Sequence, residues 1–272
     1  MSVIDKYLSK YFLGEAFEDA LFNEENNIRE LACSWKIMST TILFGELLKL
    51  GYESWLWRGI GLPLHLADPS LQGDIDLMFA LRRGEPQNGR VKFIGPVYRC
   101  FELKTSKVTR NGDVKSLKEG KFHKTKAQLE KLCKIGAPEV HLLEAFIIEA
   151  GFSTHPEMPA MPAAVRESIA RKYNQIVGTE FGYVALPMQQ MLGFDEQHTR
   201  LMWPTERIKH ASISQLRPPF SNLVAAVEAH LAIASKERGY SPVVGYCADC
   251  KSLTCVHQRG PYVCEKCEAP LV

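Results

Sequence analysis

The stretches GDIDL (73–77) and FELKT (101–105) decide the fold and the chemistry expected of this chain. In the second stretch Glu102 and Lys104 are two residues apart, so in a strand their side chains project from one face while Leu103 points to the other. Asp76 lies at the start of an apolar run, 75–81, that is typical of a buried strand. A hairpin between the two strands would bring Asp76 beside Glu102.

Two carboxylates that share one site repel each other unless they share a hard cation. Such a cation can polarise a phosphoryl oxygen, activate water and neutralise a leaving oxyanion, which is what phosphodiester hydrolysis requires. We therefore expect Asp76, Glu102 and the Leu103 carbonyl to bind Mg²⁺ or Mn²⁺. Lys104 would orient the attacking water and stabilise charge in the transition state.

The two motifs together resemble the core of the PD-(D/E)xK nuclease superfamily over residues 28–149. The resemblance implies a restriction-endonuclease-like α/β core with a mixed central sheet flanked by helices, and it assigns the chemistry to the acid of the first motif and both charges of the second. It also implies an acid from the preceding helix, for which Glu46 is the candidate and Glu30 the alternative. The chain departs from the pattern in having Ile75 in place of proline and a longer segment between the motifs. Asp74 remains an alternative metal ligand, or a group that contacts the ligands without binding the metal itself.

A basic segment follows the second motif. Residues 104–134 hold nine lysines and one arginine against three acids, a net charge of +7, although the whole chain has a net charge of only +2. A phosphate backbone would be attracted to such a segment. We expect contacts to nucleic acid from Lys107, Lys121, Lys124 and Gln128, the last three on a helix typical of the superfamily. The resemblance alone favours DNA over RNA.

Apolar periodicity and turn residues predict the remaining elements. Helices are expected at 28–50, 121–134, 162–176 and 221–236, the last with Ser221 as its N-cap. Strands are expected at 52–58, 74–81, 91–94, 97–103, 139–149 and 181–189, with a loop at 63–73, a turn at 84–89 and a proline-rich linker at 155–162. No element is assigned to residues 192–219.

Five of the eight cysteines fall in the last twenty-six residues. Cys247 and Cys250 form one CxxC pair and Cys264 and Cys267 another, which is the ligand pattern of a closed, structural zinc site. Cys255 and His257 are nearby substitutes, and Cys33, Cys100 and Cys133 fit buried thiols. Such a zinc ribbon could grip nucleic acid or dock on the nuclease core.

The expected domains are a nuclease core with N-terminal helices (1–155), an extension of that core (156–240) and the zinc ribbon (241–272). We find no secretion signal or membrane span, which favours the cytoplasm, and no phosphate-binding glycine loop, which argues against a nucleotide cofactor. The expected function is a metal-dependent endonuclease acting on DNA in defence, restriction, recombination or repair, as a homodimer or with a partner protein. The alternatives are a nucleic-acid-binding protein without catalysis and a zinc-ribbon adaptor for other proteins.

Overall fold

The structure is a computed structural model, and it describes residues 52–87, 90–108, 114–115, 119–148, 163–192, 198–202, 206–234, 243–256, 264 and 266–269. The predicted helix at 28–50, with Glu30 and Glu46, lies outside the described residues, as do the linker at 155–162 and His257.

The described elements are ten strands and four helical segments, with the helical segments interspersed among groups of strands. The helical segments are η2 (Leu64–Leu66), α5 (Glu119–Lys134), α6 (Ala163–Ile176) and α7 (Phe220–Ala234). The first strands are β1 (Tyr52–Pro63), β2 (Asp74–Gln87), β3 (Arg90–Val108), β4 (Val114–Lys115) and β5 (Glu139–Ile148). The later strands are β6 (Gly182–Leu192), β7 (His198–Met202), β8 (Glu206–Lys209), β9 (Val243–Cys247) and β10 (Ser252–Val256).

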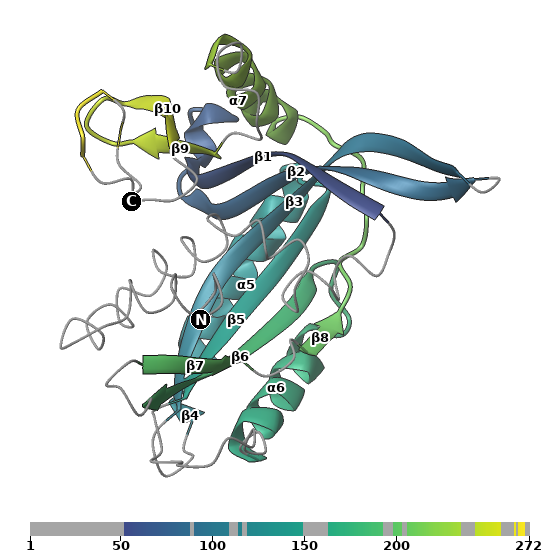
Figure 1. Cartoon of the computed structure of the whole chain (residues 1–272), viewed down its shortest axis with the longest axis vertical. Helices are drawn as coiled ribbons and strands as arrows, with labels where there is room; N and C mark the ends of the chain where they lie inside the picture. The colour runs from purple at the N-terminus through teal and green to yellow at the C-terminus, as the bar shows by residue number, and fades with distance from the viewer. Residues whose placement is uncertain are drawn as a thin grey trace.

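One mixed sheet of ten strands connects all of these strands, in the order β10-β9-β1-β2-β3-β5-β6-β7, with β4 beside β3 and β8 beside β6. Strands β1, β2 and β3 form an antiparallel meander, whereas β3, β5 and β6 run parallel. The crossover from β3 to β5 passes through α5 and that from β5 to β6 through α6, as parallel pairing requires. The predicted α/β class with a mixed sheet is confirmed (Figure 1).

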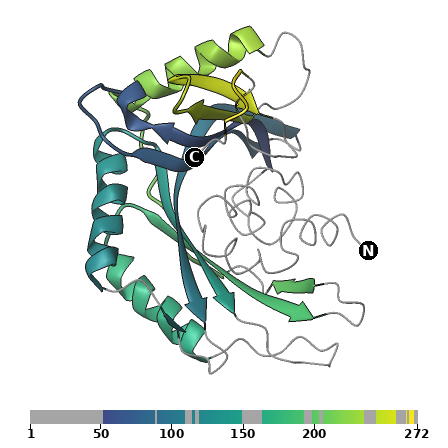
Figure 2. The same cartoon turned by 90° about the vertical axis from the view of Figure 1, so that its left-hand side faces the viewer.

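Helices α5 and α6 lie along one face of the curved sheet (Figure 2). The inner side of α5 carries Phe122, Leu129 and Leu132 at helical spacing, and these side chains are buried in the same core cluster as Cys100 and Leu142 of the sheet. Burial of these apolar faces holds the layers together. None of the described helices is long and apolar enough to cross a membrane.

The hairpin between β2 and β3 differs from the prediction. Strand β2 continues through Gln87, and Gln87 pairs with Arg90, so only Asn88 and Gly89 separate the strands. The expected turn over 84–89 is therefore wrong for residues 84–87, because an Asn-Gly pair alone suffices for a two-residue hairpin. The two predicted strands at 91–94 and 97–103 are one strand with a register shift opposite Leu81/Arg83, where Gly95 has a φ of 124°.

Two further predictions need correction. The unassigned stretch contains the short strands β7 and β8, which pair with β6 and whose periodicity is too brief to read from sequence. Helix α7 begins at Phe220, so Ser221 lies inside its first turn and is not the N-cap.

The cysteine-bearing C-terminal segment belongs to the same sheet. Strands β9 and β10 form an antiparallel pair, and β9 pairs in parallel with β1 through Arg58, Gly59 and Ile60. Helix α7 contacts η2 and β10 from one side. The segment is therefore docked on the core, and its binding of nucleic acid stays a prediction.

Gly136, two residues past the end of α5, lies where the backbone packs closely against Arg217. Its φ is 97°, and an added Cβ would lie 2.5 Å from the Arg217 carbonyl oxygen. We expect Gly136→Ala to lower the free energy of unfolding by about 2 kcal/mol or more, because both the backbone conformation and the packing oppose it. Denaturant unfolding measures the loss. Gly178→Ala, which meets nothing within 4 Å, should stay within about 0.5 kcal/mol of wild type.

His141 on β5 is 3% exposed, and its ring stacks on Phe101 with centroids 5.2 Å apart. Among the described residues, its Nδ1 has no hydrogen-bond partner. Burial, reinforced by the Arg99 guanidinium, lowers the pKa of His141 to about 3. The folded protein therefore holds the neutral imidazole, while the unfolded chain takes up a proton near its ordinary pKa of about 6.5.

This pKa difference predicts a pH dependence of stability. The contribution of His141 is fully present above about pH 6.5 and falls by up to ~1.4 kcal/mol per pH unit as the pH decreases toward 3. Between pH 7 and pH 5, the wild type should lose about 2 kcal/mol more than His141→Leu, measured by denaturant unfolding at both pH values. An equal loss in the two proteins would contradict this assignment.

Candidate functional site

The two acidic motifs meet where β2 and β3 separate. Their ladder ends at the pair Leu77 and Phe101, and one residue further the Asp76 carboxylate takes the place of a backbone acceptor. The Leu103 amide donates to Asp76 Oδ2 over 2.7 Å, and Asp76 is only 3% exposed. This bond holds the first acid against the second motif, as the predicted hairpin required.

Glu102 and Lys104 project together from β3. Lys104 Nζ donates to Glu102 Oε1 over 2.8 Å, and the side chains are 18% and 3% exposed, respectively. The alternation expected from the sequence is therefore present. The glutamate is buried and the lysine forms the more accessible end of the pair.

Asp74 and Asp76 have different surroundings. Asp74 is exposed at the first position of β2, where its backbone pairs with Pro63 of β1. Asp76 is buried and bonded to the second motif. Asp76 is therefore bonded to the second motif through the Leu103 amide, while Asp74 lies at the surface.

The structure describes the side chains of two of the four residues predicted to contact nucleic acid. Lys124 and Gln128 are both exposed on α5, Lys124 on the side opposite Phe122 and Gln128 at the border of the buried face. These two side chains therefore face solvent and not the sheet that carries the motifs. Lys107 lies on β3 and Lys121 on α5, and their side chains are outside the described part.

A buried polar group on β5 was missed by the sequence reasoning. Glu144 is fully buried and pairs in register with Lys104 of the neighbouring strand. Its carboxylate accepts hydrogen bonds from Ser106 over 2.7 Å and from Tyr183 over 2.8 Å. A glutamate within an otherwise apolar strand was the visible signal, because such a residue needs partners if it is to be buried.

Lys172 of α6 belongs to the same neighbourhood. Its Nζ lies 4.2 Å from the centroid of the Phe122 ring, where a cation is attracted by the ring face. Burial lowers the pKa of Lys172, and the negative charge of Glu144 opposes that shift. The sheet face beneath α5 and α6 thus carries buried charge beside the acidic motifs.

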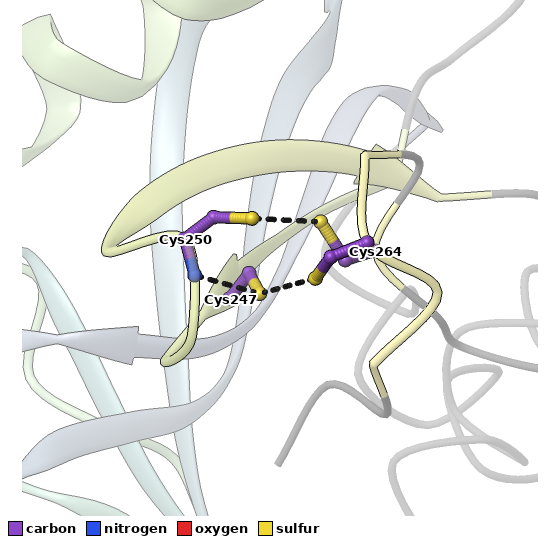
Figure 3. A group of neighbouring side chains, drawn as sticks. Cys247, Cys250 and Cys264 are labelled. Carbon is purple, nitrogen blue, oxygen red and sulfur yellow. Dashed lines mark hydrogen bonds between the residues drawn. The ribbon is translucent and has the colours of Figure 1, made fainter.

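The four predicted zinc ligands gather at one point. The sulfurs of Cys247, Cys250, Cys264 and Cys267 all lie within 4.8 Å of one another. Two of the sulfur pairs are 3.5 and 3.8 Å apart, and Figure 3 shows Cys250 facing Cys264. A tetrahedral zinc with Zn–S bonds of about 2.3 Å would place its sulfurs roughly 3.8 Å apart, so the group has the right size.

Each cysteine pair forms a tight turn with the same backbone features. The Cys250 amide donates to Cys247 Sγ and the Lys266 amide to Cys264 Sγ, both over 3.4 Å. The residue after each pair has a left-handed backbone, with φ of 51° at Lys251 and 60° at Glu268. The Lys266 amide also helps to lower the pKa of Cys264 to about 6, which favours the thiolate that a metal requires.

Cys255, one of the two substitute ligands, lies elsewhere. It is buried on β10, and its Sγ is 3.8 Å from His230 Nε2 of α7. Its side chain therefore contributes to the packing of α7 on the sheet. The converging group consists of the four cysteines of the two CxxC pairs.

Substitution of single cysteines should separate these roles. We expect the purified protein to hold about one zinc per chain and Cys264→Ser to lose it, with a thermal midpoint at least about 5 °C lower, because metal binding contributes directly to folding. Cys255→Ser is the matched control and should retain the zinc. Elemental analysis and thermal unfolding provide the readouts. Full zinc in Cys264→Ser would contradict the assignment.

We compared the chain with models of protein families, with curated proteins and with solved structures. None of these matches it. The case for a function therefore depends on the geometry of the two groups described above.

Proposed function

We propose that this protein is a Mg²⁺- or Mn²⁺-dependent endonuclease of the PD-(D/E)xK type that hydrolyses phosphodiester bonds of DNA. The observation that supports this most directly is the bond from the Leu103 amide to Asp76, which holds an acid of β2 against the Glu-x-Lys motif of β3. The order of three antiparallel strands, a helix and a parallel strand agrees with the core that the motifs predict.

The oxygen donors at this point fit a hard divalent cation. Mg²⁺ in phosphate-processing sites takes one or two carboxylates and retains several waters. Asp76, Glu102 and the Leu103 carbonyl would supply that set. Among the described residues, no group of three or more acids or histidines converges, and the only such group of ligating side chains is the cysteine group.

Each residue of the site has a distinct proposed role. A bound cation would supply charge neutralisation at the phosphate and activation of water. Asp76 and Glu102 would bind and orient that cation, with Asp76 held by the Leu103 amide. Lys104, the most exposed of the three, would place its ammonium beside the scissile phosphate and stabilise the developing negative charge.

We also propose that the four-cysteine group holds a structural zinc. All four ligands are sulfurs from protein side chains, and such a closed set leaves no position for substrate. Because Cys247 ends β9 and β9 pairs with β1, the metal would stabilise the edge of the same sheet that carries the acids.

A nucleic-acid-binding protein without catalysis is the second candidate. Its support is the burial of Asp76 and Glu102, at 3% and 2% exposure, together with the ion pair between Glu102 and Lys104. Removing one partner of such a buried pair is strongly destabilising, by about 3–5 kcal/mol, so the motif would have a structural value of its own.

Cleavage of supercoiled plasmid in the presence of Mg²⁺ or Mn²⁺ tests the proposal. The wild type should nick or linearise the plasmid, and Lys104→Ala should lower the rate by at least about a hundredfold, because an electrostatic contact made in the transition state is lost. Circular dichroism verifies that the variant is folded. Inert wild type on duplex, single-stranded and branched DNA would overturn the enzyme proposal and favour the second candidate.

The two neighbouring aspartates provide a matched pair of variants within that assay. Asp76→Asn should abolish cleavage, since it removes one of the two carboxylates of the proposed cation site. Asp74→Asn changes an exposed acid two residues away and should retain the wild-type rate within about threefold. The reverse result would transfer the ligand role to Asp74.

A further inference from the structure

The distal part of the β2–β3 hairpin projects from the body of the protein (Figure 1). We call residues 82–94 the basic ribbon. Among the described residues, β1 pairs with β2 as far as Gly84, and beyond that point the ribbon consists of β2 and β3. Three arginines and one lysine stand against a single glutamate, a net charge of +3 in thirteen residues. Nothing in the proposed cation or zinc sites uses this segment.

The register places the charges of the ribbon on one face. Cross-strand partners in an antiparallel pair share a face, and successive residues alternate. The pairs Arg83 with Ile94, Glu85 with Lys92, and Gln87 with Arg90 therefore lie on one side. The pairs Gly84 with Phe93 and Pro86 with Val91 lie on the other.

The two faces thus differ in chemistry. The first face carries three cationic positions, the acidic position Glu85 and one amide, a net charge of +2, whereas the pairs of the other face carry no charged residue. Arg82 lies at the register shift and belongs to neither set of pairs. Among the ribbon side chains that the structure describes, Arg82 and Lys92 are both exposed.

We infer that the basic ribbon binds duplex DNA, with its cationic face against the phosphates of a groove. A two-stranded ribbon has the dimensions of the major groove, which is about 12 Å wide and about 8.5 Å deep. The four residues from Gly84 to Gln87 extend roughly 14 Å, enough to enter it. Neutralisation of phosphates by arginine and lysine supplies most of the affinity of such contacts.

The position of the ribbon relative to the proposed cleavage site favours a duplex. Asp76 and Arg83 lie on the same strand, seven residues apart, which corresponds to about 24 Å along β2. One turn of duplex DNA measures about 34 Å, so both contacts fit within a single turn. This inference rests on the proposed function for its choice of DNA, but the binding itself does not require catalysis.

Binding of a fluorescein-labelled 24-base-pair duplex to the full chain, measured by anisotropy without added Mg²⁺ or Mn²⁺, tests the inference. The variant Arg83→Ala/Arg90→Ala/Lys92→Ala should bind at least about tenfold more weakly near 0.1 M salt. The slope of log K against log salt concentration should fall by about 2.7, since three phosphate contacts would be lost.

The matched control removes three exposed arginines elsewhere: Arg166→Ala/Arg171→Ala/Arg217→Ala. This control should bind within about threefold of wild type, because its charges lie outside the proposed contact. The substitution Arg83→Lys/Arg90→Lys should also retain most of the affinity, since point charges suffice for phosphates. Equal weakening by the ribbon variant and the control would overturn the inference. So would a lack of duplex binding by the wild type, or an equal loss on single-stranded DNA.

Failure of this inference and failure of the proposed function are distinguishable. Lys104→Ala should lose cleavage but remove at most one phosphate contact, so its duplex affinity should fall far less than that of the ribbon variant. If the wild type binds through the ribbon but does not cleave, only the nuclease proposal fails. If the ribbon variant cleaves plasmid with unchanged KM and kcat, only the ribbon inference fails.

Discussion

Strand β3 is paired along both edges, and the difference between its two neighbours organises the molecule. On one side β2 runs antiparallel and leaves the ladder after Leu77, while on the other side β5 runs parallel and stays in register through Val108. The Leu103 amide would lose its acceptor where β2 departs, and an unpaired buried amide is costly, by about 1–3 kcal/mol. The Asp76 carboxylate supplies that acceptor. The same bond therefore satisfies the backbone and positions the acid.

Buried charge is concentrated on the central strands, where the acids Glu102, Glu139 and Glu144 are all buried and all have partners. Glu102 pairs with Lys104, Glu139 with Arg99, and Glu144 accepts from two hydroxyl groups. Burial of an ion without a partner costs several kcal/mol, so these contacts are a condition for the fold as well as a resource for chemistry. A chain that needed only a stable core could fill these positions with apolar residues. The presence of buried charges at these positions therefore calls for a functional explanation as well as a structural one.

Local patterns in the sequence were enough to predict the α/β class, helices α5 and α6 and the cysteine group. Periodicity and ligand spacing are short-range signals that can be seen in the sequence alone. The length of the β2–β3 hairpin was underestimated, since Gly84 and Pro86 resemble turn residues although they pair within a ribbon. The hydroxyl partners of Glu144 come from two other strands, so only the sheet order brings them together. The union of β9 with β1 joins segments nearly two hundred residues apart and leaves no local trace in the sequence.

That last pairing changes which strand forms the edge of the sheet. Strand β1 would be the border of the meander if the C-terminal strands were absent, and a long border strand with open amides and carbonyls is a template for association with other chains. Strand β9 covers that border at Arg58, Gly59 and Ile60, and β10, the next strand in the sheet order, has only five residues. A short outer strand is a poor template. Disruption of the cysteine-bearing module, for example by oxidation of its thiols, would therefore uncover this part of the β1 edge to other chains.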